Sequence, residues 1–499
     1  MVFSSTVFLF LFLPIALLSY FLVRSELRNA WLLAVSLFFY AWGETFLVSI
    51  LFISIIVNYI SGLLISNGFS PGSIHTLPKD CSRSRAQKLG LVLSITVNLA
   101  LLGFFKYFNF GMDSFNDLMA VLGFEQGQWD TTLRITLPLG ISFFTFQSMS
   151  YTIDVYLGNT KATRNILNFA TFVTLFPQLV AGPIVRYKQI ADDLVSRTVT
   201  LDCMAGGSKR FVIGLGKKMI IANTVAWPAD QIFALPDSEI TMGLAWFGIL
   251  CYTLQIYFDF SGYSDMAIGI GLMFGFRFPE NFNYPYISQS IKDFWRRWHI
   301  SLSSWFRDYL YIPLGGSQKG TFRTYFNLVL VFFLCGLWHG ASWTFVVWGL
   351  YHGFFLVIER MRFGDWISWL WRPLRHTYTL IVAMVGWLLF RAETFSQALI
   401  FLKAMVGFAP GDGIVHSAEA YCTNEVGLAI LLGIIGSLPW LPTLQSKLTS
   451  FADKLHGAVG RPLEFLHRVM ELAFLCVVFV YCAMLLSAQT HNPFIYFRF

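Results

Sequence analysis

Long apolar runs alternate with short polar segments along nearly the whole chain. About twelve of them approach the roughly 20 mostly apolar residues that a helix needs to cross a membrane. They lie near residues 6–23, 30–43, 45–66, 89–105, 136–156, 211–227, 240–258, 325–338, 343–358, 378–391, 426–441 and 469–488. Three further apolar stretches, 165–184, 264–276 and 396–407, are expected to be re-entrant or tilted. No long hydrophilic segment interrupts the series. The pattern therefore predicts an all-α polytopic membrane protein in which residues 1–499 form one domain.

The apolar stretch 165–184 contains residues that break helices. Its sequence "FPQLVAGPIVR" places Pro177, Gly182 and Pro183 within the run. Irregular backbone at membrane depth is tolerated only where it is buried in protein or lines a cavity. We therefore expect a broken, re-entrant element here.

The segment from Phe278 to Gly316 is too polar to span a membrane, yet it is dense in aromatic residues. From Ser288 onward its periodicity predicts one helix, with Asp293 and Arg297 forming a favourable i,i+4 pair. Spacings of 4, 3 and 4 residues form an apolar stripe of Trp298, Leu302, Trp305 and Tyr309. A helix of this kind is typical of an anchor at the membrane interface.

Composition supports the membrane assignment. Hydrophobic residues make up 56% of the chain and charged residues only 13%, about half the charged fraction of a typical soluble protein. The net charge of +7 does not indicate nucleic-acid binding, because Lys and Arg in membrane proteins mostly mark cytoplasmic loops. The seven cysteines lack CxxC spacing, so neither a disulfide framework nor a zinc site is predicted.

The distribution of basic residues predicts the orientation. The first apolar run lacks a positive leader and a cleavage site, so it is interpreted as a first span rather than a signal peptide. Basic residues then fall on one side of the predicted spans, whereas the loops 106–133 and 228–239 on the other side are acidic or nearly uncharged. The positive-inside rule places the basic side in the cytoplasm and both termini outside. The basic positions are Arg24, Arg28, Lys79, Arg83, Arg85, Lys88, Lys161, Arg164, Arg186, Lys188, Lys209, Arg210, Lys217, Lys218 and the clusters in 292–323, 360–375 and 447–468.

One ionisable residue lies between two apolar runs, in "CGLWHGASW". His339 is flanked there by Trp338 and Gly340. Ionisable groups within a membrane are costly and are candidates for function. A buried imidazole is expected to be neutral and can act as a general base, while the glycine permits close packing or the approach of a substrate. A structural histidine that is hydrogen-bonded to a neighbouring helix is the alternative.

Three further polar features leave a functional and a structural interpretation open. His299 lies beside the apolar stripe, where a lone histidine is usually a hydrogen-bonded structural residue. Asp259 and Asp265, in "YFDFSGYSDMA", could pair with arginines of the central segment, bind a cation or shape a bend; ion pairing is favoured. Lys106, in "FFKYFNF", is interpreted most simply as a residue that snorkels to the interface.

Taken together, these segments resemble the bacterial branch of the membrane-bound O-acyltransferase family. The most specific match is "ENFNYPYISQSIKDFWRRWHISLSSWFRDYLYIPLGG" followed by "GLWHGASWTFVVWGLYHG". It extends to "DFSGYSDMAIGIGLMFGFRF", "LPLGISFFTFQSMSYTIDVY", "FPQLVAGPIVR" and "FRAETF", and so covers nearly the whole chain. The opening segment and the closing "FIYFRF" are most similar to the branch that acts in alginate O-acetylation.

The resemblance implies a catalytic segment at about 278–358, with His339 as the essential histidine and His299 in a second polar position. It also implies a ring of about 11–12 transmembrane helices around a thin central region, with re-entrant or interfacial helices and opposed funnels that meet near His339. His352 is expected to support packing or the tunnel wall. Weaker candidates for substrate or donor contact are Arg296, Arg297, Arg307, Trp298, Trp338, Asp259, Asp265 and His352.

The implied activity is transfer of an acetyl group from a cytoplasmic thioester, acetyl-CoA above all, with no bound cofactor or metal. The expected location is the bacterial inner membrane, and the expected partner is a periplasmic acetyltransferase of the SGNH type or another polysaccharide O-acetylation protein. The acceptor stays open between alginate, peptidoglycan and other polymers. A transporter of an acyl carrier and a scaffold for polysaccharide export are the alternatives from other classes.

Overall fold

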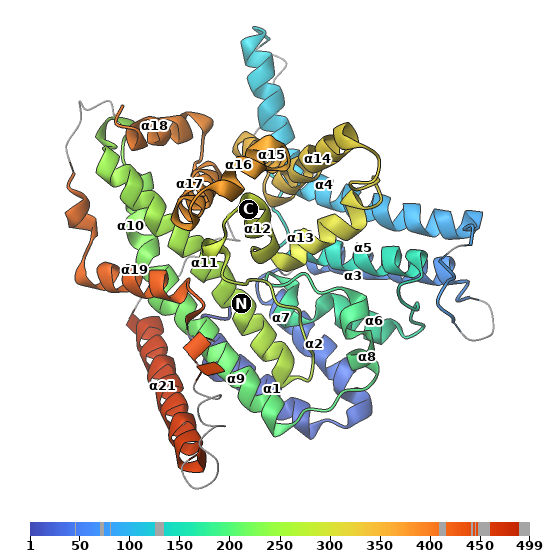
Figure 1. The fold of residues 1–499 in the computed structure, drawn as a ribbon. Coiled ribbons are helices and arrows are strands. Elements are labelled where there is room, and N and C mark those ends of the chain that lie inside the picture. Colours follow the sequence, from blue (N-terminus) through green and yellow to red (C-terminus); the bar gives the residue numbers. More distant parts are fainter. Residues whose placement is uncertain are drawn as a thin grey trace.

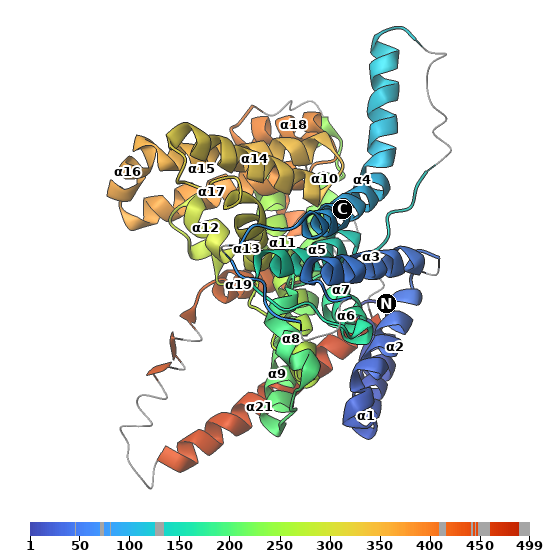
Figure 2. The same cartoon turned by 90° about the vertical axis from the view of Figure 1, so that its right-hand side faces the viewer.

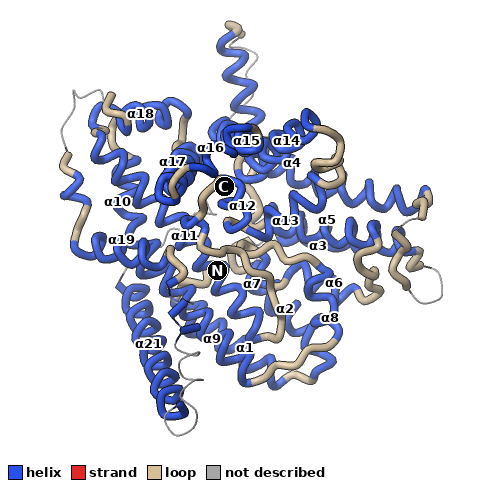
Figure 3. Tube along the Cα trace, viewed as in Figure 1, coloured by secondary structure: helices blue, strands red, loops and turns tan. Residues whose placement is uncertain are grey.

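The computed structural model describes residues 1–44, 46–69, 74–79, 81–124, 134–408, 416–440, 443–444, 446–447 and 460–488. Within these ranges every regular element is a helix, as Figure 3 shows, and no strand occurs. The all-α prediction is confirmed. All seven cysteines are free, as their spacing predicts.

The N-terminal half begins with α1 (Leu13–Leu22), which continues the π-helical turn η1 (Phe8–Phe12). The helices that follow are α2 (Arg28–Ala41), α3 (Val48–Ser66), α4 (Arg85–Val121), α5 (Ile141–Leu157), α6 (Ile166–Thr174), α7 (Phe176–Leu179), α8 (Tyr187–Val195), α9 (Leu201–Gly216), η4 (Lys217–Ala222), α10 (Asn223–Phe233) and α11 (Met242–Met273).

The C-terminal half begins with short helices and ends with long ones. They are η6 (Pro285–Ile287), α12 (Ile291–Arg297), α13 (Ile300–Phe306), η7 (Arg307–Tyr311), α14 (Thr321–His339), α15 (Trp343–Arg360), α16 (Arg362–Trp369), α17 (Arg372–Arg391), α18 (Phe395–Met405), α19 (Asn424–Gly436) and α21 (Gly460–Ala488).

A helix occupies each of the twelve predicted spans. Among the residues that the structure describes, four helical segments are individually long and apolar enough to cross a membrane: Val48–Ser66, Arg85–Val121, Thr321–His339 and Phe465–Ala488. Shorter apolar helices lie at Phe8–Leu22, Phe395–Met405 and Asn424–Gly436. The remaining predicted spans are helical but shorter or more polar. The chain is thus a multi-pass membrane protein.

Helix α11 forms the centre of the molecule (Figures 1 and 2). It contacts α9, α10, α17, α18 and α19 along its length. On one side of it, α14 packs against α15, and α3 packs against α4 and α5. Helix α21 lies along α9 in both views. The C-terminal part of α4 (cyan) projects beyond the other helices, as Figure 2 shows most clearly.

The broken element near 165–184 is confirmed. Helix α6 ends at Thr174, the short α7 follows, and residues 180–186 are not helical. At 1.5 Å per residue, a helix as short as α6 rises only about 14 Å, less than half of a membrane's hydrocarbon core. Residues 169–187, which include the non-helical part, are buried in protein, which fits the requirement that irregular backbone be shielded from lipid.

Two predicted boundaries were wrong. The predicted loop 106–133 begins inside α4, which continues to Val121; residues 125–133 lie outside the described ranges. The apolar stretch 264–276 is not a separate tilted element, because α11 continues through it to Met273. Carboxylates within α11 have cationic partners on neighbouring elements, so the helix needs no bend where Asp259 and Asp265 occur.

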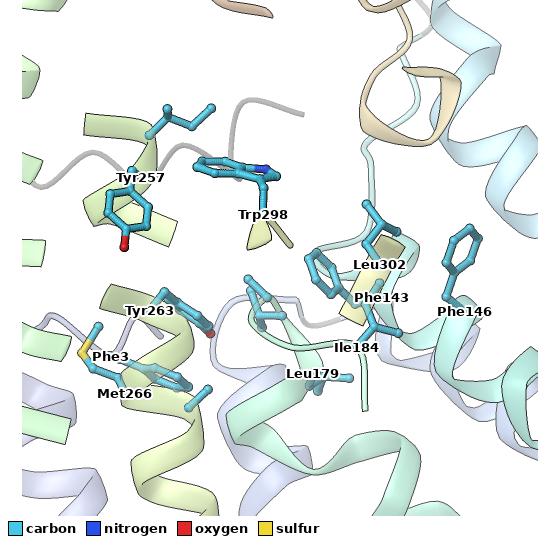
Figure 4. Packing of buried hydrophobic residues seen from close by; sticks show 14 of the residues in the cluster. Phe3, Phe143, Phe146, Leu179, Ile184, Tyr257, Tyr263, Met266, Trp298 and Leu302 are labelled. Atoms are coloured by element: carbon cyan, nitrogen blue, oxygen red, sulfur yellow. The ribbon is translucent and has the colours of Figure 1, made fainter. Parts of the chain in front are cut away.

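The prediction of one helix from Ser288 onward was also wrong. Helix α12 begins after Ser290, whose side chain accepts a hydrogen bond from the Asp293 amide at 3.0 Å, but it ends at Arg297. The chain turns at His299, with φ +44°, before α13 begins. The aromatic residues of the predicted stripe are core rather than interfacial, since Trp298 and Trp305 are buried. Figure 4 shows Trp298 and Leu302 within the packed interior.

Candidate active site

His339 is the last residue of α14 and is buried, with 5% of its surface exposed. Three aromatic rings meet its imidazole edge-to-face, with centroid distances of 4.9 Å to Trp338, 5.0 Å to Trp348 and 5.2 Å to Phe390. Its Nδ1 is buried and has no hydrogen-bond partner in the described part of the chain. The imidazole is therefore held by packing rather than by a hydrogen bond at Nδ1.

Gly340 allows α14 to end against α15. A Cβ at this position would overlap the ring of Phe345, so any larger residue displaces that ring. Further along the same contact, a Cβ on Gly336 would overlap the Phe345 carbonyl, and one on Gly349 would overlap the Phe332 carbonyl. Small residues that let two helices approach closely are typical of membrane interfaces. The predicted role of Gly340 in close packing is confirmed.

His299 lies between α12 and α13, directly before the first residue of α13, and is 1% exposed. Its left-handed backbone, with φ +44° and ψ 56°, is unusual for a residue with a side chain. Asn281 compensates for the interrupted helix: its carbonyl accepts from the Ile300 amide at 2.9 Å, and its Oδ1 accepts from the Ser301 amide at 3.3 Å. A loop residue thus replaces the acceptors that a continuous helix would have provided.

Asn281 also fixes the tautomer of His299. Because the Ser301 amide can only donate, the Asn281 atom that it contacts is the oxygen Oδ1. The same oxygen lies 3.0 Å from Nδ1 of His299, so Nδ1 carries the proton and donates it. The amide nitrogen of Asn281 donates to the Ser264 hydroxyl at 3.0 Å. Nε2 of His299 is therefore the unprotonated nitrogen, and it has no partner among the described residues.

Trp338 separates the two histidines. Its ring centroid lies 4.9 Å from that of His339 and 6.2 Å from that of His299. Its indole nitrogen points to the Ser142 carbonyl at 3.4 Å, and its ring packs on Phe143 and Phe146 of α5. The structure thus brings together the two histidines that the sequence analysis singled out, 40 residues apart in the chain.

A cavity of about 110 Å³ opens beside His339. Its lining includes Lys106, Ser142, Trp338 and His339 together with the backbone that precedes α5. That backbone follows the predicted extracytoplasmic loop 106–133. The cavity therefore approaches His339 from the side that the basic-residue pattern assigns to the exterior.

A larger cavity of about 770 Å³ lies on the side of His299. Asn281 and Ile300, which adjoin His299 through hydrogen bonding and sequence, both line it. Its rim includes Lys209, Arg210 and Lys217, which belong to the predicted cytoplasmic side. The smaller cavity thus reaches His339 and the larger one reaches the neighbours of His299, on sides of opposite predicted topology.

Trp298 and Trp338 belong to the packed aromatic interior around the two histidines. Trp298 packs on Trp387 and Phe282, with centroid distances of 4.6 Å and 5.0 Å. Figure 4 shows it between Tyr257 of α11 and the α5 residues Phe143 and Phe146. Trp338 lines the smaller cavity directly.

His352 is buried in α15 among Trp295, Trp348 and Tyr351, with centroid distances of 5.0, 5.1 and 5.3 Å. Neither ring nitrogen has a hydrogen-bond partner within the described ranges. A Cβ on Gly386 would lie 2.5 Å from its Nε2, so α17 packs closely on this ring. The position fits the packing role expected for His352.

The three arginine candidates line neither cavity. Arg296 is exposed, and Arg297 donates to Asp293 at 3.0 Å, which confirms the predicted i,i+4 pair. Arg307 is exposed and donates to Asp308 at 2.6 Å.

Asp259 and Asp265 form ion pairs, as the sequence analysis favoured, but with partners other than the arginines of the central segment. Asp259 lies 2.6 Å from Lys218, and both side chains are 2% exposed. Asp265 accepts from Lys217 at 2.7 Å and from Arg210 at 2.8 Å. These pairs join α11 to α9 and η4. Among the described residues, no group of three or more acidic, His or Cys side chains is arranged to hold a metal ion.

The interpretation of Lys106 as a snorkelling residue was wrong. Its side chain is only 8% exposed, and its ammonium group donates to the backbone carbonyls of Trp338 and His339. Asn281, the partner of His299, was not singled out either, although it lies in the motif "ENFNYPY". Only the tertiary structure shows both contacts, because neither has a signature in local sequence.

Comparison with known proteins bears on the same segments. The model of the membrane-bound O-acyltransferase family matches residues 160–390. The probable alginate O-acetylases AlgI of Pseudomonas putida and Pseudomonas syringae pv. tomato are 46% and 49% identical to this chain, with full coverage of both chains in each case. The chain belongs to the membrane-bound O-acyltransferase family.

The peptidoglycan O-acetyltransferase of Helicobacter pylori is 39% identical over 84% of this chain and 82% of its own length. The matched region contains His299 and His339, so the histidine pair is part of a membrane-bound O-acyltransferase fold.

Proposed function

We propose that this protein is a membrane O-acetyltransferase that passes acetyl groups from a cytoplasmic thioester donor across the membrane for the O-acetylation of alginate. Full-length similarity to several probable alginate O-acetylases supports both the reaction class and the polymer. The observation that carries the proposal is the position of His299 and His339, which lie on either side of Trp338 between two cavities of opposite predicted topology.

In the proposed reaction, a hydroxyl oxygen attacks the thioester carbonyl carbon, and its proton passes to the imidazole of His339. A C–O bond forms as the carbonyl becomes an oxyanion. Collapse of this intermediate breaks the C–S bond, and the departing sulfur takes the proton back from the imidazole. The products are an acetyl ester and a free thiol, and His339 returns to its neutral state. If His339 carries the acetyl group instead, a C–N bond to the imidazole forms as the C–S bond breaks and the departing sulfur takes the imidazole N–H proton. The hydroxyl oxygen then forms the C–O bond as the C–N bond breaks, and the hydroxyl proton returns to the imidazole.

His299 is proposed to orient a reactant. Its Nδ1 proton is committed to Asn281, so Nε2 presents a lone pair and can accept a hydrogen bond but not donate one. In this tautomer it can accept a hydrogen bond from a donor group of a reactant other than the hydroxyl whose proton passes to His339. Stabilising the oxyanion would require a donor, and neutral His299 does not supply one at Nε2.

Acetyl-CoA is the proposed donor, entering through the larger cavity. The predicted cytoplasmic position of that cavity and its size support this choice. The positive charges of Arg210 and Lys217 at its rim are neutralised by carboxylates of the same chain, because Arg210 pairs with Asp265 and Glu280, and Lys217 pairs with Asp265. The support therefore comes from location and shape rather than from unpaired positive charge.

The proposed immediate acceptor is a serine hydroxyl of a periplasmic SGNH-type acetyltransferase, which then modifies the polymer. The pattern GxSxG occurs once in the sequence, at residues 68–72, but it follows the helix α3 rather than a strand and so lacks the strand–turn–helix context of a nucleophile elbow, which supports transfer to a separate protein. The proposed location is the bacterial inner membrane with both termini on the periplasmic side, on the basis of the basic-residue pattern.

A second acceptor is favoured by one specific similarity. The peptidoglycan O-acetyltransferase of Helicobacter pylori aligns over most of both chains, at lower identity than the probable alginate O-acetylases. The same chemistry would serve peptidoglycan. Acetyl esters found on cell-wall sugars and not on exopolysaccharide, in cells that carry this chain, would favour this second acceptor.

The purified protein in proteoliposomes with acetyl-CoA labelled in the acetyl group tests the reaction class. Release of free thiol together with labelled acetyl ester on an added hydroxyl acceptor supports the enzyme. Movement of intact label across the membrane with the thioester unbroken would instead identify a transporter and refute the proposal.

A further inference from the structure

The C-terminal turn of α14 exposes carbonyl groups that have no partner within the helix. Such carbonyls need donors from elsewhere when they are buried. One is satisfied locally, because the Gly340 amide donates to the Gly336 carbonyl at 3.3 Å. The next three belong to Leu337, Trp338 and His339, and all three accept from α4.

Two consecutive residues of α4 provide these donors. The Tyr107 hydroxyl donates to the Leu337 carbonyl, and the Lys106 ammonium donates to the Trp338 carbonyl. Lys106 also donates to the His339 carbonyl at 2.9 Å. Lys106 and Tyr107, which lie 230 or more positions away in sequence, therefore cap the end of α14 that carries the proposed catalytic imidazole.

The remaining contact of Lys106 defines its role. Its ammonium lies 3.4 Å from the Ser142 hydroxyl of α5, which lines the same cavity as His339. An ammonium has three N–H donors, and these three oxygens account for all of them. Lys106 therefore has no N–H left to stabilise an oxyanion. A cation beside the C-terminus of a helix also interacts favourably with the helix dipole.

We propose that Lys106 is a positioning residue for acyl transfer: together with Tyr107 it caps α14 and fixes His339 at the edge of the smaller cavity. This inference rests on the proposed function of His339. The carbonyl of His339 is tied to α4 through Lys106, and its ring is held by Trp348 and Phe390, so both backbone and side chain are fixed. Losing the backbone restraint lets the imidazole drift while substrate binding in the larger cavity is left intact.

The test compares Lys106→Met with Lys88→Met in proteoliposomes by measuring thiol release from acetyl-CoA. Lys88 lies on the first turn of the same helix and is exposed, so it is a matched control. We expect Lys106→Met to lower kcat about 10- to 100-fold with KM within about twofold, because a misplacement of about 1 Å at a reacting group can cost about 100-fold. Lys106→Arg should recover part of kcat, because guanidinium can still reach carbonyl oxygens.

Folded Lys106→Met protein with wild-type kcat would overturn the proposal. So would a rise in KM alone, since that would assign Lys106 to substrate binding. If Lys106→Met fails to fold, the variant Tyr107→Phe provides the test, because it removes only the hydroxyl that caps Leu337. A kcat lowered about threefold or more at unchanged KM supports the cap. Wild-type kcat for Tyr107→Phe refutes it. Wild-type protein that releases no thiol would instead refute the proposed function itself, so the two failures are distinguishable.

Discussion

Nδ1 of His299 lies 3.0 Å from Oδ1 of Asn281, and this hydrogen bond determines which nitrogen of the imidazole is free. The same oxygen accepts from the Ser301 hydroxyl at 2.8 Å and from the Ser301 amide. Asn281 thus holds both the tautomer of His299 and the turn on which His299 lies. The residue that orients this histidine comes from the loop after α11, not from the helices on either side.

Replacing Asn281 with Leu should lower acetyl transfer about 10- to 100-fold, because the imidazole loses both its tautomer and its fixed orientation. Ser301→Ala removes one of the three donors to the same oxygen and should cost less. Thiol release by the purified variants measures both effects. Equal activity of Asn281→Leu and wild type would show that His299 needs no such orientation.

His352 provides a matched comparison for His339, because both are buried histidines that contact Trp348. Since neither nitrogen of His352 has a polar partner in the described structure, its contribution is expected to be packing. His352→Leu should retain activity within about tenfold of wild type. The substitution changes the shape of a packed side chain and should lower the free energy of unfolding by about 1 to 3 kcal/mol. A His352 variant as inactive as His339→Ala, with unchanged thermal stability, would assign His352 to the chemistry.

Gly340→Ala should destabilise the protein by about 1 to 3 kcal/mol, because the new methyl group overlaps the ring of Phe345. A lower apparent Tm in detergent and reduced activity are the expected readouts. The second substitution Phe345→Leu in the same chain should restore part of both, since it makes room for the methyl group. If the double variant is no better than Gly340→Ala, the glycine serves something other than this contact.

The ion pair between Lys218 and Asp259 should behave as a buried structural pair. Lys218→Met leaves the Asp259 carboxylate without its partner at 2.6 Å and should cost about 3 to 5 kcal/mol. The double variant Lys218→Met/Asp259→Leu removes both charges and should recover most of that loss. A double-mutant cycle on thermal unfolding measures the coupling. Additive losses would mean that the two groups do not depend on each other.

Hydrophobic periodicity was sufficient to locate a helix in each of the twelve predicted spans, because a lipid-facing surface demands apolar residues over a defined length. It also located the break at "FPQLVAGPIVR", where Pro177 and Pro183 disturb the helical pattern. The interruption at His299 could not be predicted in this way. The stripe through Trp298 is continuous in sequence, and the helix is interrupted where Asn281, in a separate loop, accepts hydrogen bonds from the amides of Ile300 and Ser301.

The same reason explains why the partners of three buried charged residues were not predicted. Lys106 has the sequence surroundings of a snorkelling residue, and only the end of α14, more than 230 residues away, shows what its ammonium binds. Asp259 and Asp265 were correctly expected to pair, but their cations come from α9 and η4 rather than from the arginine-rich segment. Local pattern indicates that a buried charge needs a partner, and tertiary structure decides which one.

The most direct test of the account is the acetyl content of the exopolysaccharide made by cells in which this chain carries the single substitution His339→Ala. With the variant present in the membrane at wild-type amounts by immunoblot, we predict that acetyl esters fall at least about 100-fold, the least that removing a general base or nucleophile is expected to cost. Polymer acetylated to within a few-fold of the wild-type level would contradict the assignment of His339 to the chemistry.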